Sequence, residues 1–184
     1  PASALSVLFG APLASYTGAL LADTAVPTWN ASQDNLSYLF VSSAAMASSG
    51  VALITTPTTQ NRPARIFAAL GSAADLYFAE KLTEPMHPAE AEPLETGSPA
   101  TKLRWAKRLV IAGGIGAALL SRNRAAAIAS GAALATASYL TRSGILNAGL
   151  NSTKDPRHVV EPQRDRLAAR RAQGIVDDSI TTVG

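Results

Sequence analysis

Very few ionisable side chains lie inside the long apolar stretches of this chain, and those few are the residues best able to carry chemistry. Asp75 and Glu80 belong to one such stretch, residues 64–80. A carboxylate inside a membrane costs about 2.5–3.5 kcal/mol on insertion scales, so such groups tend to be functional or paired. A carboxyl group removed from water is also suited to proton exchange. We therefore expect Asp75 and Glu80 to transfer protons.

Tyr16 and Asp23 lie within and just after the first apolar stretch. A phenol in an apolar helix needs a hydrogen-bond partner, which is either a ligand or the backbone carbonyl that Pro12 leaves without its donor. Asp23 follows seven residues later, and the helical period places it on nearly the same face as Tyr16. Asp23 is thus either a proton relay or a carboxylate exposed at the membrane surface.

Arg142 closes the fifth apolar stretch and is placed to pair with an acid or with a lipid headgroup. Metal-binding side chains are scarce, because there is no cysteine, and His87 and His158 both lie in polar connecting segments. The chain therefore supplies no disulfide, no thiolate zinc site and no iron–sulfur ligand. A haem b held between paired histidines is not expected either, because its ligands would have to lie on the apolar helices.

Five apolar stretches rich in Ala and Gly must position these groups, at residues 4–22, 36–56, 64–80, 108–121 and 125–141. A membrane-spanning helix needs about 20 mostly apolar residues, and small residues let such helices approach closely. The stretch SYLFVSSAAMASSGVALITT offers no charged face to water, which disfavours a soluble Ala-rich bundle. We therefore predict an all-α integral membrane helical bundle with about five transmembrane helices.

The polar segments predict the domain organisation and the orientation. Residues 1–142 form the predicted transmembrane bundle, and residues 143–184 form a polar tail with a short basic helix, RDRLAARRAQ. The link TEPMHPAEAEPLETGSP, rich in Pro and Glu, is expected to be irregular. Lys and Arg gather on the side of the bundle that carries the tail. The positive-inside rule therefore predicts a multi-pass protein of the plasma membrane with a cytoplasmic C-terminus.

Three segments carry a resemblance to a known family. They are YTGALLADTAVPTW at 16–29, LSYLFVSSAAMASSG at 36–50 and TRSGILNAGLNSTKDPRHVVEPQRDRL at 141–167. In this order they resemble the NrfD / polysulfide reductase membrane-subunit family in its actinobacterial form. The resemblance covers nearly the whole chain, which is similar to the C-terminal part of a protein of eight or more helices. It implies that N-terminal helices of the same chain precede Pro1.

The resemblance implies a haem-free, quinone-binding membrane anchor of a molybdenum or tungsten iron–sulfur oxidoreductase. Electrons would pass between menaquinone and a ferredoxin-like iron–sulfur subunit, while the metal chemistry would occur in a molybdopterin-type catalytic subunit. Tyr16 is similar to the tyrosine that lines the quinol site of the family, where it would donate to a quinone carbonyl. Family members usually have Glu near Asp75 and read FGVFEAG where this chain reads SGILNAG, so Asn147 stands in place of an acid.

Two other functions fit the same sequence, namely a structural anchor whose quinone site lies in other helices and a small membrane transporter. The scarcity of charged residues in the apolar stretches weighs against transport. Nucleic-acid binding is not expected, because the basic tail has no aromatic platform beside it. The tail is instead expected to contact the membrane surface or a partner subunit through Arg164, Arg166, Arg170 and Arg171.

Overall fold

The computed structural model describes residues 2–175, with side chains for residues 9, 10 and 12–175. Within this part of the chain every regular element is a helix and no strand occurs, which confirms the all-α prediction. The elements are α1 (Ala2–Ala22), α2 (Pro27–Ala31), α3 (Gln33–Thr55), α4 (Arg62–Lys81), α5 (Pro88–Glu95), α6 (Gly97–Ile115), the π-helical turn η1 (Gly116–Leu120), α7 (Arg124–Ser152) and α8 (Arg157–Ala172).

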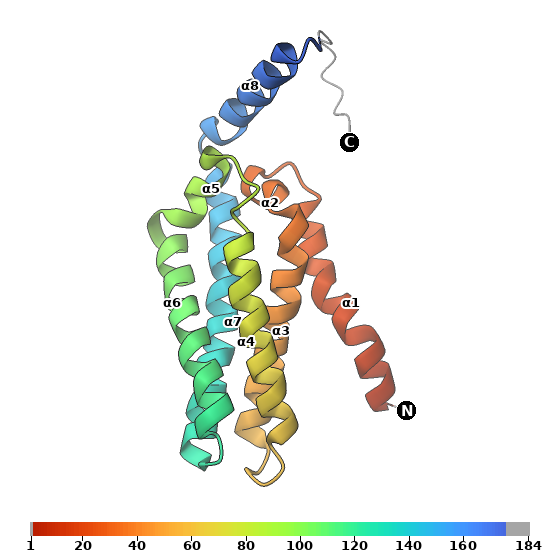
Figure 1. Ribbon diagram of the computed structural model, residues 1–184, viewed down its shortest axis with the longest axis vertical. Coiled ribbons are helices and arrows are strands. Elements are labelled where there is room, and N and C mark those ends of the chain that lie inside the picture. The colour runs from red at the N-terminus through yellow and green to blue at the C-terminus, as the bar shows by residue number, and fades with distance from the viewer. Residues whose placement is uncertain (1, 176–184) are drawn as a thin grey trace.

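Four long helices form the bundle, and a fifth lies beside it (Figure 1). α3 packs against α4 and α7, and α6 packs against α7. α1 contacts α3 and diverges from the other helices toward its N-terminal end (Figure 1). These five long helices, with η1 continuing α6, cover the five apolar stretches to within one residue, but α6 begins well before its stretch, at Gly97, and α7 continues well beyond its own, to Ser152.

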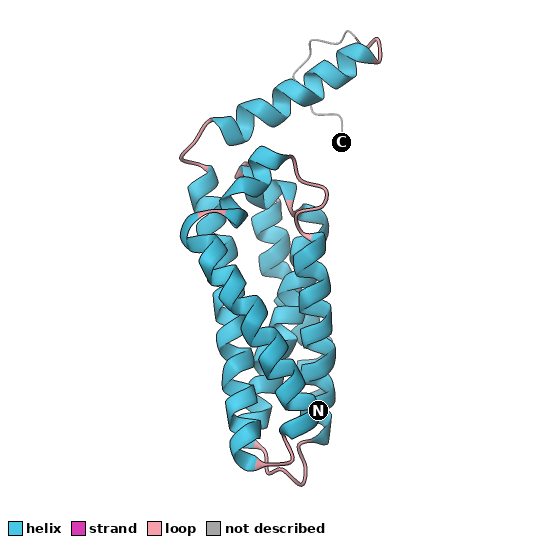
Figure 2. Ribbon diagram, turned by 60° about the vertical axis from the view of Figure 1, so that its left-hand side comes forward, coloured by secondary structure: helices cyan, strands magenta, loops and turns pink. Residues whose placement is uncertain are grey.

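α7 is the longest of the described helices, with 29 residues. It continues to Ser152, past residue 142, at which the polar tail was predicted to begin, and it packs against α2 and α5 at the end of the bundle. After a short turn, α8 contains the predicted basic helix and projects from that end (Figure 2). Residues 176–184 of the predicted tail lie outside the described residues.

The link predicted to be irregular contains α5, so that prediction is wrong. His87 and Glu90 form a capping box at its start: Nδ1 of His87 accepts from the N–H of Ala89 at 3.2 Å, and Oε2 of Glu90 accepts from the N–H of His87 at 3.1 Å. Pro88 begins the helix, where its missing N–H would have had no helical acceptor. A residue type that suggested a break therefore starts a helix here.

Small residues bring the long helices into backbone contact. A Cβ on Gly50 of α3 would lie 2.6 Å from the carbonyl oxygen of Gly131 on α7, and a Cβ on Gly18 of α1 would lie 2.7 Å from the α3 backbone. The hydroxyls of Ser43 and Ser138 form a buried hydrogen bond of 2.8 Å between α3 and α7. Glycine contacts and hydroxyl pairs of this kind are how membrane helices associate in lipid, where the hydrophobic effect does not drive them together.

Over the residues whose side chains the structure describes, 9, 10 and 12–175, α3 alone has both the length and the apolar composition to cross a bilayer by itself. α4, α6 and α7 fall short because they carry Arg or Lys and because their apolar residues are mainly Ala and Gly. α6, for example, has Lys102, Arg104, Lys107 and Arg108 in its sequence. The structure therefore supports one candidate span, and the bundle of about five spans stays a prediction.

Candidate functional site

A cavity of about 140 Å³ lies near the end of the bundle that carries α5. All four bundle helices and α5 contribute to its wall. Its apolar lining is Leu39 from α3, Leu76 and Ala79 from α4, Leu82 from the following link, Leu94 from α5, Leu103 from α6 and Ile145 from α7. The cavity is similar in volume to an engineered protein cavity, about 150 Å³, that stays dry and binds benzene. A single six-membered ring therefore fits the space.

Asp75 of α4 supplies the buried carboxyl group of this cavity. Its side chain lines the cavity and is 3% exposed, and its Oδ1 has no hydrogen-bond partner among the described residues. Thr141 of α7 brings a buried hydroxyl to the same wall. Glu95 and Lys107 also line the cavity but are exposed, so they mark its side toward solvent. Thr83, which is half-buried, adds a second hydroxyl, so the interior is apolar except for one carboxyl group and two hydroxyl groups.

Arg142 lies beside the cavity, next in sequence to Thr141. Its Nη2 donates to the carbonyl oxygen of Phe40 at 2.9 Å, and its guanidinium carbon lies 4.8 Å from the centre of the Phe40 ring. Its positive charge acts on Asp75 electrostatically, but the two side chains form no ion pair. Arg142 is therefore held on α3, and a carboxylate oxygen of Asp75 stays free to meet a ligand.

Glu80 lies at the solvent side of the cavity, about one turn and a half beyond Asp75 on α4. Its Oε1 accepts from Nζ of Lys107 at 2.8 Å, and both side chains are exposed. An exposed ion pair of this kind contributes little to stability. Lys107 lines the cavity whereas Glu80 does not, so the ion pair lies at the rim of the cavity and Glu80 is in contact with water.

Tyr16 and Asp23 do not reach the cavity. Both are exposed, Tyr16 at 62%, and the Tyr16 hydroxyl makes no hydrogen bond to a described residue. In the same helix, Oγ of Ser15 donates to the carbonyl oxygen of Pro12 at 2.9 Å. Of the residues singled out from the sequence, the structure places Asp75 in the cavity wall, Arg142 within electrostatic reach of it and Glu80 at the rim through Lys107, and it leaves Tyr16 and Asp23 apart.

The sequence analysis did not single out Thr141, Lys107 or the leucines that line the cavity. Thr141 could have been identified from its position, because it precedes Arg142 at the end of the fifth apolar stretch. Leu103 and Lys107 are four residues apart on one helix face and both line the cavity. Leu94 belongs to α5, which was expected to be irregular, so nothing in the sequence placed it against the bundle.

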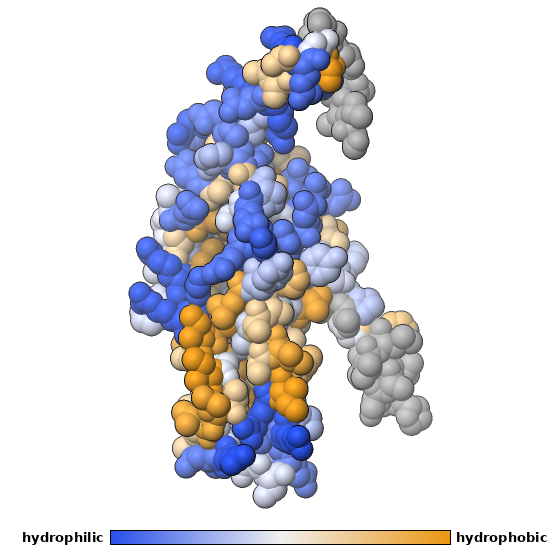
Figure 3. Space-filling view, in the orientation of Figure 1, coloured by the Kyte–Doolittle hydropathy of each residue, from blue (hydrophilic) through white to orange (hydrophobic). Residues whose placement is uncertain are grey.

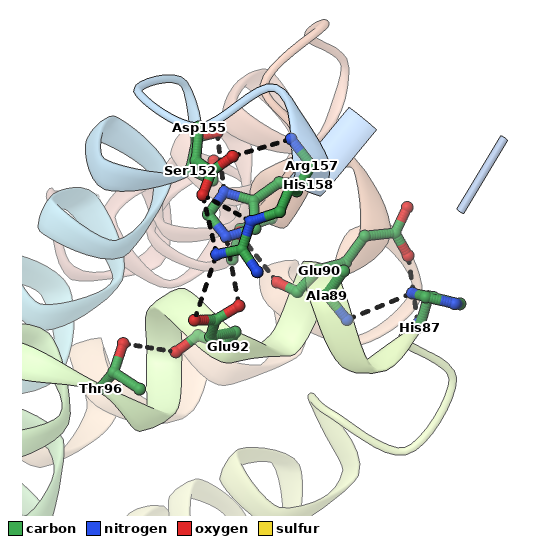
Figure 4. Close-up of polar contacts among 10 residues, drawn as sticks. His87, Ala89, Glu90, Glu92, Thr96, Ser152, Asp155, Arg157 and His158 are labelled. Atoms are coloured by element: carbon green, nitrogen blue, oxygen red, sulfur yellow. Dashed lines mark hydrogen bonds and ion pairs between the residues drawn. The ribbon is translucent and has the colours of Figure 1, made fainter. Parts of the chain in front are cut away.

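Ion pairs connect α8 to α5 at this end of the bundle. The carboxylate of Glu92 lies between Arg157 and His158, at 3.9 Å and 3.6 Å (Figure 4). Because Nδ1 of His87 accepts from the N–H of Ala89, Nε2 of His87 is the donor, and Oδ2 of Asp165 accepts from it at 2.9 Å. A hydrogen bond from Arg157 lowers the pKa of Asp155 and fixes the turn that starts α8 (Figure 4). Because α5 supplies Leu94 to the cavity, this network also fixes one wall of it.

No group of three or more His, Cys, Asp or Glu side chains among the described residues is arranged to hold a metal ion. Comparison with known proteins adds no relative, because no family model, no curated protein and no solved structure matches the chain. The candidate site therefore rests on its own geometry, which is an apolar, ring-sized cavity with one buried carboxyl group.

Proposed function

We propose that this chain is a haem-free membrane subunit that exchanges electrons and protons with menaquinone. In this proposal it anchors a molybdenum or tungsten iron–sulfur oxidoreductase, whose ferredoxin-like subunit takes or gives the electrons. The observation that carries the proposal is the buried carboxyl group of Asp75, with one oxygen unpartnered, in an otherwise apolar cavity of about 140 Å³. That combination suits the hydroxyl-bearing ring of a menaquinol, whose second fused ring and isoprenoid tail would extend out of the cavity.

The chemistry of a quinol explains why one buried carboxyl group is useful. Oxidation of a quinol to a quinone releases two electrons and two protons, and a base within hydrogen-bond reach accelerates proton removal. Asp75 is the buried base of the cavity, and the Thr141 hydroxyl offers a second polar contact. A proton accepted by Asp75 then has Glu80 and Lys107 between it and solvent.

The segments that carry the family resemblance meet around this cavity. Nε1 of Trp29, from the first segment, donates to the carbonyl oxygen of Ile145, from the third, at 2.9 Å. Leu39, from the second segment, and Ile145 both line the cavity. Arg142, from the third segment, binds Phe40 of the second. Residues far apart in the sequence are thus assembled at one place, which supports a shared functional role for the three segments.

The surface supports a membrane setting for the bundle. Large apolar side chains are exposed on all five long helices, including Leu13, Leu20, Val51, Leu70, Ile115, Leu119 and Leu146. Figure 3 shows hydrophobic stripes over the lower part of the bundle, between a hydrophilic lower end and a larger hydrophilic upper region. An exposed apolar surface of this extent marks an interaction surface in a monomer. We propose that it faces lipid in the plasma membrane, with α8 on the cytoplasmic side.

Reconstitution tests this function directly. The complete complex, purified with its iron–sulfur subunit and placed in proteoliposomes, is expected to reduce its iron–sulfur clusters when menaquinol is added, as followed by their electron paramagnetic resonance signals. Omission of this subunit is expected to abolish the reduction. Equal reduction without the subunit would contradict the proposal.

A purely structural anchor is the second candidate, because Tyr16, which resembles a quinol-site residue, faces outward from the described bundle. The variants Tyr16→Phe and Asp75→Asn separate the candidates in the same assay. If the quinone binds in the cavity, Asp75→Asn should lose menaquinol-dependent reduction of the iron–sulfur clusters and Tyr16→Phe should keep it. Normal turnover in both variants would favour the structural anchor. Loss of turnover in Tyr16→Phe alone would indicate that the quinone binds at α1.

A further inference from the structure

Basic side chains gather on one segment of α6 without matching acids. Lys102, Arg104, Lys107 and Arg108 fall within seven residues, and of these four only Lys107 has an acidic partner, Glu80. Arg104 donates to the Thr101 hydroxyl at 3.3 Å, and the Arg108 guanidinium lies over the Trp105 ring at 5.1 Å. Two guanidinium groups and an indole are therefore presented together on the surface.

A strip of exposed apolar side chains continues directly from this basic segment. Arg104, Arg108, Ile111 and Ile115 follow one another at intervals of three or four residues, so they share a face of α6, and Leu119 of η1 follows them. All five are exposed, Leu119 at 70%. We call this face the α6 stripe. Figure 3 shows the same order on the surface of the bundle, with hydrophilic residues above a hydrophobic stripe.

We propose that the α6 stripe binds an anionic phospholipid. Its phosphate contacts Arg104 and Arg108, the Trp105 ring lies at the depth of the glycerol, and the acyl chains follow Ile111, Ile115 and Leu119. Tryptophan and basic residues hold these positions at membrane interfaces, where cations attract anionic headgroups. The inference depends on the membrane setting proposed above, but not on the quinone or on Asp75.

The length of the apolar strip explains why a specific lipid is favoured here. Residues 109–120 cover about 18 Å at the helical rise per residue, which is shorter than a bilayer core of about 30 Å. Long basic side chains at the upper end must therefore extend toward the headgroups while their stems stay in the apolar layer. A free anion would need only the guanidinium groups, whereas a phospholipid also covers the exposed apolar side chains below them.

The two tryptophans of the chain make the proposal measurable. Trp29 is 7% exposed and packed against α7, whereas Trp105 is 53% exposed and lies beside the α6 stripe, under Arg108. Lipids with brominated acyl chains quench the fluorescence of tryptophans that they touch. We expect brominated phosphatidylglycerol to quench Trp105 in the reconstituted protein at a roughly tenfold lower mole fraction than brominated phosphatidylcholine. The variant Trp105→Phe should lose the quenchable component.

The double variant Arg104→Gln/Arg108→Gln should lose this preference, so that both lipids quench Trp105 equally. Arg122→Gln, which removes an exposed cation at the opposite end of the bundle, is the matched control and should keep it. Equal quenching of the unaltered protein by both lipids, or a preference that survives in the double variant, would overturn the proposed site. Quenching by neither lipid would also overturn it, and would show that the membrane setting itself is wrong.

Discussion

Replacement of Asp75 by asparagine is expected to slow menaquinol-dependent electron transfer in the complex at least about a hundredfold, which is the scale of one lost general base. Asparagine keeps the shape of the side chain and the volume of the cavity but cannot accept a proton. The rate is measured as reduction of the iron–sulfur subunit by menaquinol in proteoliposomes. Asp23→Asn, which changes an exposed carboxylate on the α1 side, should leave the rate unchanged.

The stability of the same variant distinguishes lost chemistry from lost structure. Asp75 is buried with an oxygen that lacks a partner, and such a group stabilises a fold poorly. Asp75→Asn should therefore unfold at the same or a higher denaturant concentration than the unaltered protein. A folded variant that oxidises menaquinol at the unaltered rate would show that Asp75 is not the proton acceptor.

Gly131→Leu is expected to destabilise the bundle by about 3 kcal/mol, the upper part of the range for side chains forced into a packed interior. Any Cβ at this position would meet the carbonyl oxygen of Gly50 and the side chain of Ile54, both on α3. The obstacle at Gly50 is backbone, so it cannot move aside as a flexible side chain does. α3 and α7 would have to separate, which would also break the hydrogen bond between Ser43 and Ser138.

Unfolding of the purified protein in detergent, followed by circular dichroism with increasing sodium dodecyl sulfate, measures this effect. Gly10→Leu is the matched control, because a Cβ on Gly10 of α1 meets no atom of the described residues within 4 Å. Gly10→Leu should unfold at the same concentration of sodium dodecyl sulfate as the unaltered protein. An unchanged midpoint for Gly131→Leu would contradict the close contact of α3 and α7 on which the bundle depends.

The positions of the long helices could be predicted from the sequence because each apolar stretch is separated from the next by Pro, Gly or charged residues. α5 could not be predicted in this way, since the prolines near it are equally typical of irregular links. What decides its structure is the capping box of His87 and Glu90 and the burial of Leu94 against the bundle. Such stabilisation depends on tertiary contacts that a reading of one segment does not contain.

The candidate site was predictable in part. Asp75 could be singled out because a carboxylate in an apolar stretch is costly unless it is paired or functional. Arg142 could be singled out because it ends another apolar stretch. Their proximity depends on how α4 and α7 pack across the bundle, which helical periodicity does not specify. Periodicity alone also grouped Tyr16 with Asp23, yet the outward orientation of α1 keeps both from the cavity.

Photolabelling with an azido-menaquinone analogue tests most directly whether the quinone ring occupies the cavity at Asp75. The complex is irradiated with the analogue, digested and examined by mass spectrometry, with excess menaquinone as competitor. The cavity account predicts competed labels on wall residues from α4, α6 and α7, such as Leu76, Leu103 and Ile145. Labels confined to α1 around Tyr16, or labels that menaquinone does not displace, would contradict it.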